Sequence, residues 1–451
     1  MRFKLTCIFR PLLALASFAG SGAQQAPDHS MSGQMNMPMN GGQMTMDMPG
    51  MTAPGGDFLD EILRHDSSGT SAEPNSTPAP MPMKRVGIWR LMFHGTAFLV
   101  EQQQTSPRGG DKFFSTNWFM PMAQRQLGRG ELTLRTMLSL EPATITGRQY
   151  PLLFQQGETA YGKPIVDGQH PHDFFMELAL LYDWHVAENA LLSLYLAPVG
   201  DPALGPTAYP HRPSTSEDPL AALGHHQEDS THISDDVITA GVARRIFRLE
   251  ASGFHGREPN EHRWEIQQGA IDSWSARLTV QPGKNWSGQY SFGQLHSLEA
   301  RYPTENQQRM TVSVMYNRPL EQGNWASTAL WGRTKSSPDG AIFNSYLLES
   351  TLQLARRNFV WIRIESAERS SELLQGENPL PPNFEEAPIG QVQAYTFGYD
   401  REVGGLSRIT AALGTQVTAY GVPSTLRPIY GSDPVGVAVF LRLRPRSQMT
   451  H

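Results

Sequence analysis

The chain has 451 residues, enough for several ordinary domains or one large β-domain, and its formal net charge is −6. This negative charge argues against nucleic acid as a partner. After the amino terminus, no stretch reaches about 18 apolar residues in a row, so a helical membrane span is not expected.

Residues 1–23 have the pattern of a secretory signal peptide. Arg2 and Lys4 form a charged start, an apolar stretch follows, and Ser21 and Ala23 are small residues suited to a cleavage site. The alternative is a short amino-terminal anchor. Cleavage after Ala23 would remove the only cysteine, so the mature chain would form no disulfide and no cysteine-based site.

Residues 24–84 are low in complexity and rich in Met, Pro, Gly and Ser. A segment of this kind buries too little apolar surface of its own to offset the entropy lost on ordering. We therefore predict a disordered amino-terminal arm over residues 24–84, exposed to the periplasm.

From residue 85 to the end at 451, apolar side chains alternate with polar or small ones. This period of two is the signal of a β-strand. It is clear in segments 89–99, 275–281, 309–317, 408–419 and 435–444. Many segments reach roughly ten residues, the length of a tilted membrane crossing. We predict an all-β fold, an antiparallel transmembrane β-barrel of about 14–16 strands.

Connections of two kinds separate these segments. Short polar turns are expected within 318–325, 355–361 and 402–408. Longer insertions fall at 142–173, 199–235, 257–271 and 371–391. An outer-membrane barrel has short turns on one side and long loops on the other. The predicted location is thus the outer membrane, with its lipid as a partner, and the sequence does not indicate an oligomeric state.

Aromatic residues near segment ends are typical of the girdles at a membrane interface, although Trp and Tyr also favour strands in general. They include Trp118, Trp184, Trp286, Trp325, Trp361 and Tyr420. On the opposite face, alternation directs polar residues such as Arg90, His94 and Glu177 inward. These would line a water-filled lumen, anchor loops folded into it, or form a polar network that stabilises the barrel.

The first chemical feature is a cluster of methionines in the arm. Its members are Met31, Met35, Met37, Met39, Met44, Met46, Met48 and Met51. Thioethers are soft ligands, suited to Cu(I) or Ag(I) in a compartment without thiols. The alternative is a compositionally biased linker with no ligand role.

This arm resembles the Met-rich amino-terminal regions of bacterial copper-resistance proteins, including the outer-membrane copper-resistance protein B family. The resemblance covers the Met-rich arm and the general layout, in which an arm precedes a barrel. The Met-rich repeats of that family usually carry more histidine than this arm does. It implies copper handling, with copper as the expected bound metal, and it assigns no residue of the barrel.

The second feature is histidine in the long insertions. His170 and His172 lie in 166–175, and His225, His226 and His232 lie among acidic residues in 209–236. Imidazole with carboxylate suits Zn(II), Cu(II), Fe or Mn, but the spacing matches no standard site. The alternatives are ordinary polar loop residues, or a plug whose side chains bond the barrel wall.

Motifs of common enzymes, such as G-x-S-x-G or H-E-x-x-H, do not occur in the sequence, and no catalytic residue is predicted. The leading hypothesis is an outer-membrane channel or binding protein whose arm captures copper or another soft metal. The alternatives are an outer-membrane enzyme that modifies lipid and a soluble periplasmic β-protein.

Overall fold

The computed structural model describes residues 57–79, 81–298, 304–337, 339–379, 381 and 384–446. The predicted signal peptide and the eight arm methionines lie outside these residues. The predictions made for them therefore stay predictions.

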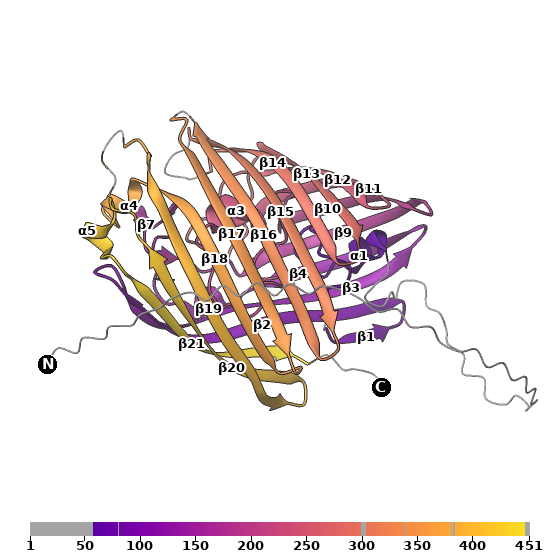
Figure 1. Ribbon diagram of the computed structural model, residues 1–451. Helices are drawn as coiled ribbons and strands as arrows, with labels where there is room; N and C mark the ends of the chain where they lie inside the picture. Colours follow the sequence, from indigo (N-terminus) through magenta and orange to yellow (C-terminus); the bar gives the residue numbers. More distant parts are fainter. Residues whose placement is uncertain are drawn as a thin grey trace, which may run out of the picture. The chain divides into compact units, whose positions relative to one another are not determined.

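Sixteen antiparallel strands form a closed ring, in which each strand pairs with the next along the chain and β21 pairs with β2 (Figure 1). A short strand, β1 (Met83–Val86), adds a hairpin to the start of β2. The ring strands are β2 (Trp89–Thr105), β3 (Asp111–Leu127), β4 (Gly130–Leu138), β9 (Phe175–Ala187), β10 (Ala190–Gly200), β11 (Ser234–Arg244), β12 (Phe247–His255), β13 (Ser273–Gly283), β14 (Trp286–His296), β15 (Asn306–Leu320), β16 (Gly323–Ser337), β17 (Ile342–Leu354), β18 (Asn358–Ser370), β19 (Pro388–Leu406), β20 (Ile409–Gly421) and β21 (Val435–Pro445). The predicted all-β barrel is confirmed.

The outer face of the ring is apolar and the inner face is polar. On β12, Leu249 points outward and is 56% exposed, whereas its neighbour Arg248 points inward and is 2% exposed. On β21, Val437 and Val439 are exposed while Ala438 is buried. Such an apolar outer band is unfavourable in water and favourable in hydrocarbon. It argues against a soluble periplasmic protein.

Exposed aromatic side chains lie at both edges of this band. Trp286 and Trp325 lie near one edge, and Trp274 and Tyr346 near the other. The girdle prediction was wrong for Trp118, Trp361 and Tyr420, which are buried. Each of these three occupies an inward position of its strand, and segment ends alone do not distinguish the two faces.

The two ends of the barrel differ in their connections. One end, the short-turn end, has only tight turns, at 128–129, 188–189, 245–246, 284–285, 321–322, 355–357 and 407–408. The other, the long-loop end, has loops that include 139–174, 201–233, 256–272 and 371–387. The predicted short turns and long insertions are both confirmed. In barrels of this type the short turns face the periplasm.

The remaining elements are short and lie in the loops of the long-loop end. They are α2 (Glu141–Thr144), β5 (Tyr150–Pro151), β6 (Glu158–Ala160), β7 (Lys163–Ile165), β8 (Gly168–Gln169), α3 (His225–Glu228), η1 (Ser230–His232), α4 (Glu372–Gln375) and α5 (Arg427–Tyr430). Strand β5 pairs with β8, and β6 pairs with β7. No helix in the described part of the chain is long and apolar enough to cross a membrane.

Residues 57–79 correct the prediction of a disordered arm that reaches residue 84. They form a plug inside the short-turn end, and most of them are buried. The plug begins with helix α1 (Phe58–Arg64), whose first turn is fixed by a capping box between Asp57 and Asp60. The apolar face of α1 packs against Leu191 and Ala243, beside two short turns.

Candidate metal site in the filled barrel lumen

Three segments of the chain occupy the lumen. The plug fills the short-turn end, and loops 139–174 and 201–233 fold inward from the long-loop end. Loop 201–233 is buried almost throughout, with only a few partly exposed positions. From the sequence, the inward polar residues could either line an open lumen or anchor folded-in segments, and the structure has the second arrangement.

Charged side chains fasten loop 201–233 to the wall. Arg212 reaches Glu349 of β17, with 2.5 Å between Nε and Oε1, and also pairs with Asp229 of its own loop. Glu217 pairs with Arg442 and Arg444 of β21 at 2.8 and 2.7 Å. Burial opposes ionisation of Glu217, but these two guanidinium groups outweigh it and lower its pKa to about 2. The loop is thus held by ion pairs that are largely buried.

The wall holds the plug mainly through the plug's backbone. Arg135 of β4 donates to the carbonyl oxygens of His65 and Gly69 while it pairs with Glu177 of β9. Arg248 of β12 donates to the Thr70 carbonyl at 2.8 Å. These bonds satisfy backbone groups that burial would otherwise leave unpaired.

The five histidines predicted from the two insertions lie together where loops 139–174 and 201–233 meet. The rings of His172 and His232 have centroids 5.3 Å apart, as do those of His225 and His232. The centroids of His225 and His226 are 5.4 Å apart. His170 joins the group through a shared carboxylate, Glu158. The structure therefore brings together residues separated by more than fifty positions in the sequence.

Three of these histidines already have close partners. His172 Nδ1 lies 3.0 Å from Glu141, and His225 Nδ1 lies 2.6 Å from Asp229. His232 Nδ1 lies 2.8 Å from the Asp229 carbonyl oxygen. These contacts form a polar network within the loops, so these three rings have a structural role whether or not a metal binds.

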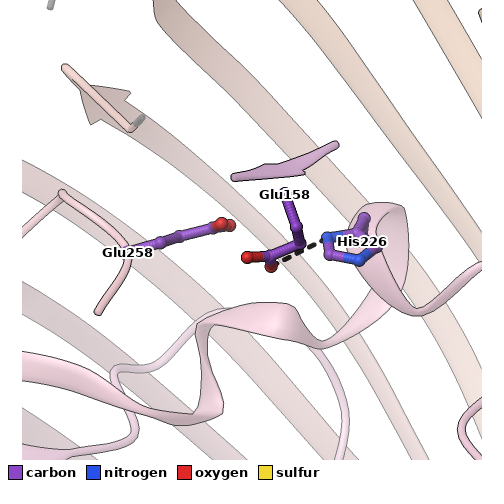
Figure 2. Close-up of side chains that lie close together, drawn as sticks. All are labelled: Glu158, His226 and Glu258. Carbon is purple, nitrogen blue, oxygen red and sulfur yellow. Dashed lines mark ion pairs between the residues drawn. The ribbon is translucent and has the colours of Figure 1, made fainter. Parts of the chain in front are cut away.

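The other two histidines share Glu158 (Figure 2). Its Oε1 atom lies 3.0 Å from His170 Nε2 and 3.6 Å from His226 Nδ1. Glu258, from loop 256–272, points toward the same place. One ligand atom from each of Glu158, His226 and Glu258 lies within 4.8 Å of the others. Two carboxylates and an imidazole are ligands for a divalent transition metal ion.

Burial and neighbouring charges set the electrostatics of this triad. Burial, followed by the charge of His225, holds the pKa of His226 well below its usual value, so its imidazole is neutral. Burial raises the pKa of Glu258 well above its usual value, and the charge of Glu158 raises it further. Two carboxylates that face each other favour a cation between them.

An acidic cavity adjoins the triad. Its volume is about 410 Å³, and His226 and Glu258 are part of its lining. The other acidic lining residues are Glu305, Asp339, Glu372, Glu385 and Glu386, and Arg309 is the lone lysine or arginine among the lining residues described. A wall of one charge sign concentrates counter-ions, so this cavity favours entry of cations.

The carboxylates of the site could not be predicted from the sequence. Glu158 lies in β6, twelve residues before His170, and Glu258 lies in a third loop. No local spacing connects either residue with His226, because their approach depends on how three loops fold into the lumen. Only the grouping of histidines with acidic residues in the insertions pointed to this region.

Fold and lumen together define a class: a transmembrane β-barrel, closed by segments of its own chain. Antiparallel barrels with an even strand number and an apolar outer band are typical of the bacterial outer membrane, and the predicted location is confirmed.

No protein-family model and no curated protein sequence matches the chain. Similar solved structures include an anion-selective porin from Comamonas acidovorans, with 11% identity, 79% of this chain and 99% of that chain covered, and a TM-score of 0.49. Salmonella typhi OmpF in complex with daunomycin has 9% identity, covers 80% and 99%, and has a TM-score of 0.48. Likeness at this level assigns no function to the chain.

Proposed function

We propose that this chain is an outer-membrane channel protein that binds a divalent transition metal ion in its outer mouth. The observation that supports the proposal most is the approach of Glu158, His226 and Glu258 from three separate loops. The acidic cavity beside them would supply cations from outside, and the segments folded into the lumen would gate passage inward.

The metal site is tested by titrating the detergent-extracted full-length protein with Zn(II) in a calorimeter. We expect Glu158→Gln to weaken binding at least tenfold, because the substitution removes a charged ligand shared by two histidines. The matched control is Glu385→Gln, which removes the same charge from the adjoining cavity, outside the triad. Equal affinities for the wild-type protein and Glu158→Gln would refute the site.

Channel activity is tested in planar bilayers. The full-length protein should conduct little, since the plug and two loops occupy its lumen. Deletion of residues 57–79 should raise single-channel conductance severalfold, while the barrel keeps its resistance to detergent. If the deleted protein folds and still conducts nothing beyond the wild-type level, the barrel serves as a receptor or an anchor instead.

Copper capture by the arm belongs to the same proposal. The eight methionines from Met31 to Met51 would bind Cu(I) at the periplasmic side and the barrel would anchor them or pass the metal outward. The informative deletion is 24–56, because residues 57–79 are part of the barrel. If this deletion removes several equivalents of bound Cu(I), copper binding by the arm is supported. If Cu(I) binding is unchanged, the arm is a linker with no ligand role.

The predicted alternative is an enzyme that modifies lipid, and a different assay tests it. It requires hydrolysis of phospholipid or lipopolysaccharide by the purified barrel, without dependence on Glu158. Such activity would replace the channel proposal.

A further inference from the structure

One part of the inner wall is built from methionine. Seven methionines occur between residues 85 and 446, and five of them belong to a single buried cluster. These five, the wall methionines, are Met92, Met120, Met122, Met137 and Met176. They lie on four neighbouring strands, β2, β3, β4 and β9, and Met81 joins them from the segment before β1.

Strand register places these side chains on the same inward face. Met92 of β2 pairs with Met122 of β3, and two positions further along His94 pairs with Met120. Directly paired inward positions have neighbouring side chains. In the part of the chain that the structure describes, other buried apolar clusters of the inner wall contain no methionine, so this patch is chemically distinct in its thioethers.

A second histidine approaches the patch from the lumen. His211 of loop 201–233 lies with Nε2 2.8 Å from the sulfur of Met137. Its ring centroid is 4.2 Å from that of Trp118 and 6.1 Å from that of His94. The patch therefore combines thioethers from the wall with imidazoles from a strand and from a loop.

Both imidazoles have an unused nitrogen. The Nδ1 atoms of His94 and His211 are buried and have no hydrogen-bond partner among the described residues. A buried polar atom without a partner is unfavourable and calls for an explanation.

We propose that the wall methionines, together with His211 and His94, form a binding site for a soft monovalent metal ion, Cu(I) or Ag(I), inside the barrel. Thioether sulfur and imidazole nitrogen are ligands that such ions favour. An ion between His211 and Met137 would separate these atoms beyond their present contact. The three rotatable bonds of the methionine side chain allow that movement.

This site is independent of the Glu158–His226–Glu258 triad in its ligands and in the class of ion it takes. It is also independent of the arm, because its residues lie in the barrel. The competing explanation is packing alone, since methionine fills irregular gaps in protein interiors. Leucine has a similar volume but no donor atom, which makes the two explanations separable.

The test is titration of the full-length protein in detergent with Ag(I), in a chloride-free buffer, followed by tryptophan fluorescence. Trp118 lies against both histidines, with ring centroids 4.8 Å from His94 and 4.2 Å from His211, so a heavy ion there should quench it. Trp118→Phe should remove the saturable quenching and thereby assign the signal. Arm-bound ions add to the total silver bound but not to this signal.

Met137→Leu and His211→Gln should each weaken the saturable quenching at least tenfold. The matched control is Met315→Leu, a buried methionine of β15 outside the cluster, which should leave the quenching unchanged. Glu158→Gln should also leave it unchanged, so failure of the divalent site is distinguishable from failure of this one. Wild-type quenching in both Met137→Leu and His211→Gln would show that the cluster is packing only.

Discussion

The plug (57–79) and loop 201–233 fill the same lumen from opposite ends, but they are attached to the wall differently. Wall side chains such as Arg363 and Arg369 bind the backbone of the loop. The loop also contributes its own charged side chains, Arg212, Glu217 and Asp218, to ion pairs with the wall. The plug is held mostly by wall side chains that bind its backbone. The first attachment therefore depends strongly on the identity of the loop's residues. The second depends mainly on the plug's path, and its main side-chain contribution is His65, which lies 2.7 Å from Asp183 of β9.

This difference matters for gating. Removal of one member of a buried ion pair leaves an uncompensated buried charge, which is costly. We therefore expect few states in which the loop is only partly detached from the wall. The plug has many weaker hydrogen bonds that can break one at a time. We therefore expect the plug to be released more readily than the loop, which stays attached to the wall.

The largest effect is expected for Arg212→Met. The substitution leaves Glu349 and Asp229 buried without their cation, which should destabilise the folded protein by about 3–5 kcal/mol. The measurement is the temperature at which the barrel loses its heat-modifiable mobility on electrophoresis. Arg408→Met, at an exposed turn, is the control and should not change it. A melting temperature equal to that of the control would show that the loop is not held by charge.

A smaller and more local effect is expected for Arg135→Met. The wall would lose its donors to two plug carbonyls and its buried pair with Glu177. The cost should be about 3 kcal/mol, the low end for a broken buried pair, because Glu177 keeps its bonds from Tyr195 and Gly69. The plug should open while the ring stays intact, because the strand pairing does not depend on Arg135. Protease cleavage within 57–79 measures the opening, and unchanged cleavage would contradict the backbone-directed attachment.

Gly69→Ala should have a moderate effect on the plug. Gly69 has φ +56°, and a Cβ there would lie 2.6 Å from the Asp201 carbonyl oxygen. Gly87 has a similar φ of +60° with nothing within 4 Å of its Cβ position. Gly87→Ala thus measures backbone strain alone, about 1–2 kcal/mol. If both variants lose equal stability, the plug tip is not packed tightly against the loop.

The smallest effect is expected for Thr70→Val. The change removes the hydroxyl that accepts from Arg277 but keeps the carbonyl that accepts from Arg248. Arg277 retains its pair with Glu250, so the loss should be at most about 1 kcal/mol. Protease cleavage of the plug should therefore stay close to the wild-type rate. Cleavage as fast as in Arg135→Met would mean that side-chain contacts, and not the backbone bonds, hold the plug.

The sequence predicted the barrel because the pattern that identifies each strand lies within a short stretch of the chain. Alternation of side chains within a strand reports which face meets lipid, and turn residues mark the ends. The tryptophans show the limit of this reasoning. Trp286 and Trp118 both lie in strand segments, and only the register of the closed ring separates the outward residue from the inward one.

The arm prediction failed over residues 57–79 for a physical reason. Composition reports how much apolar surface a segment can bury by itself. The plug is instead ordered by donors that belong to other parts of the chain, such as Arg135 and Arg248, and no property of residues 57–79 reveals them. For the same reason the histidines could be grouped from the sequence while their carboxylate partner Glu258 could not.

The pairing of β2 with β21 closes the ring, and this seam has a consequence for how the barrel forms. Thr105 of β2 donates its hydroxyl to the carbonyl of Val435, a contact that spans 330 residues. Contacts of such separation form late, because the entropy of closing so long a loop opposes them. The ring therefore stays open until its last strand has been translocated. During that interval the nascent wall remains accessible from the side, so the plug and loops can take their places before the seam shuts.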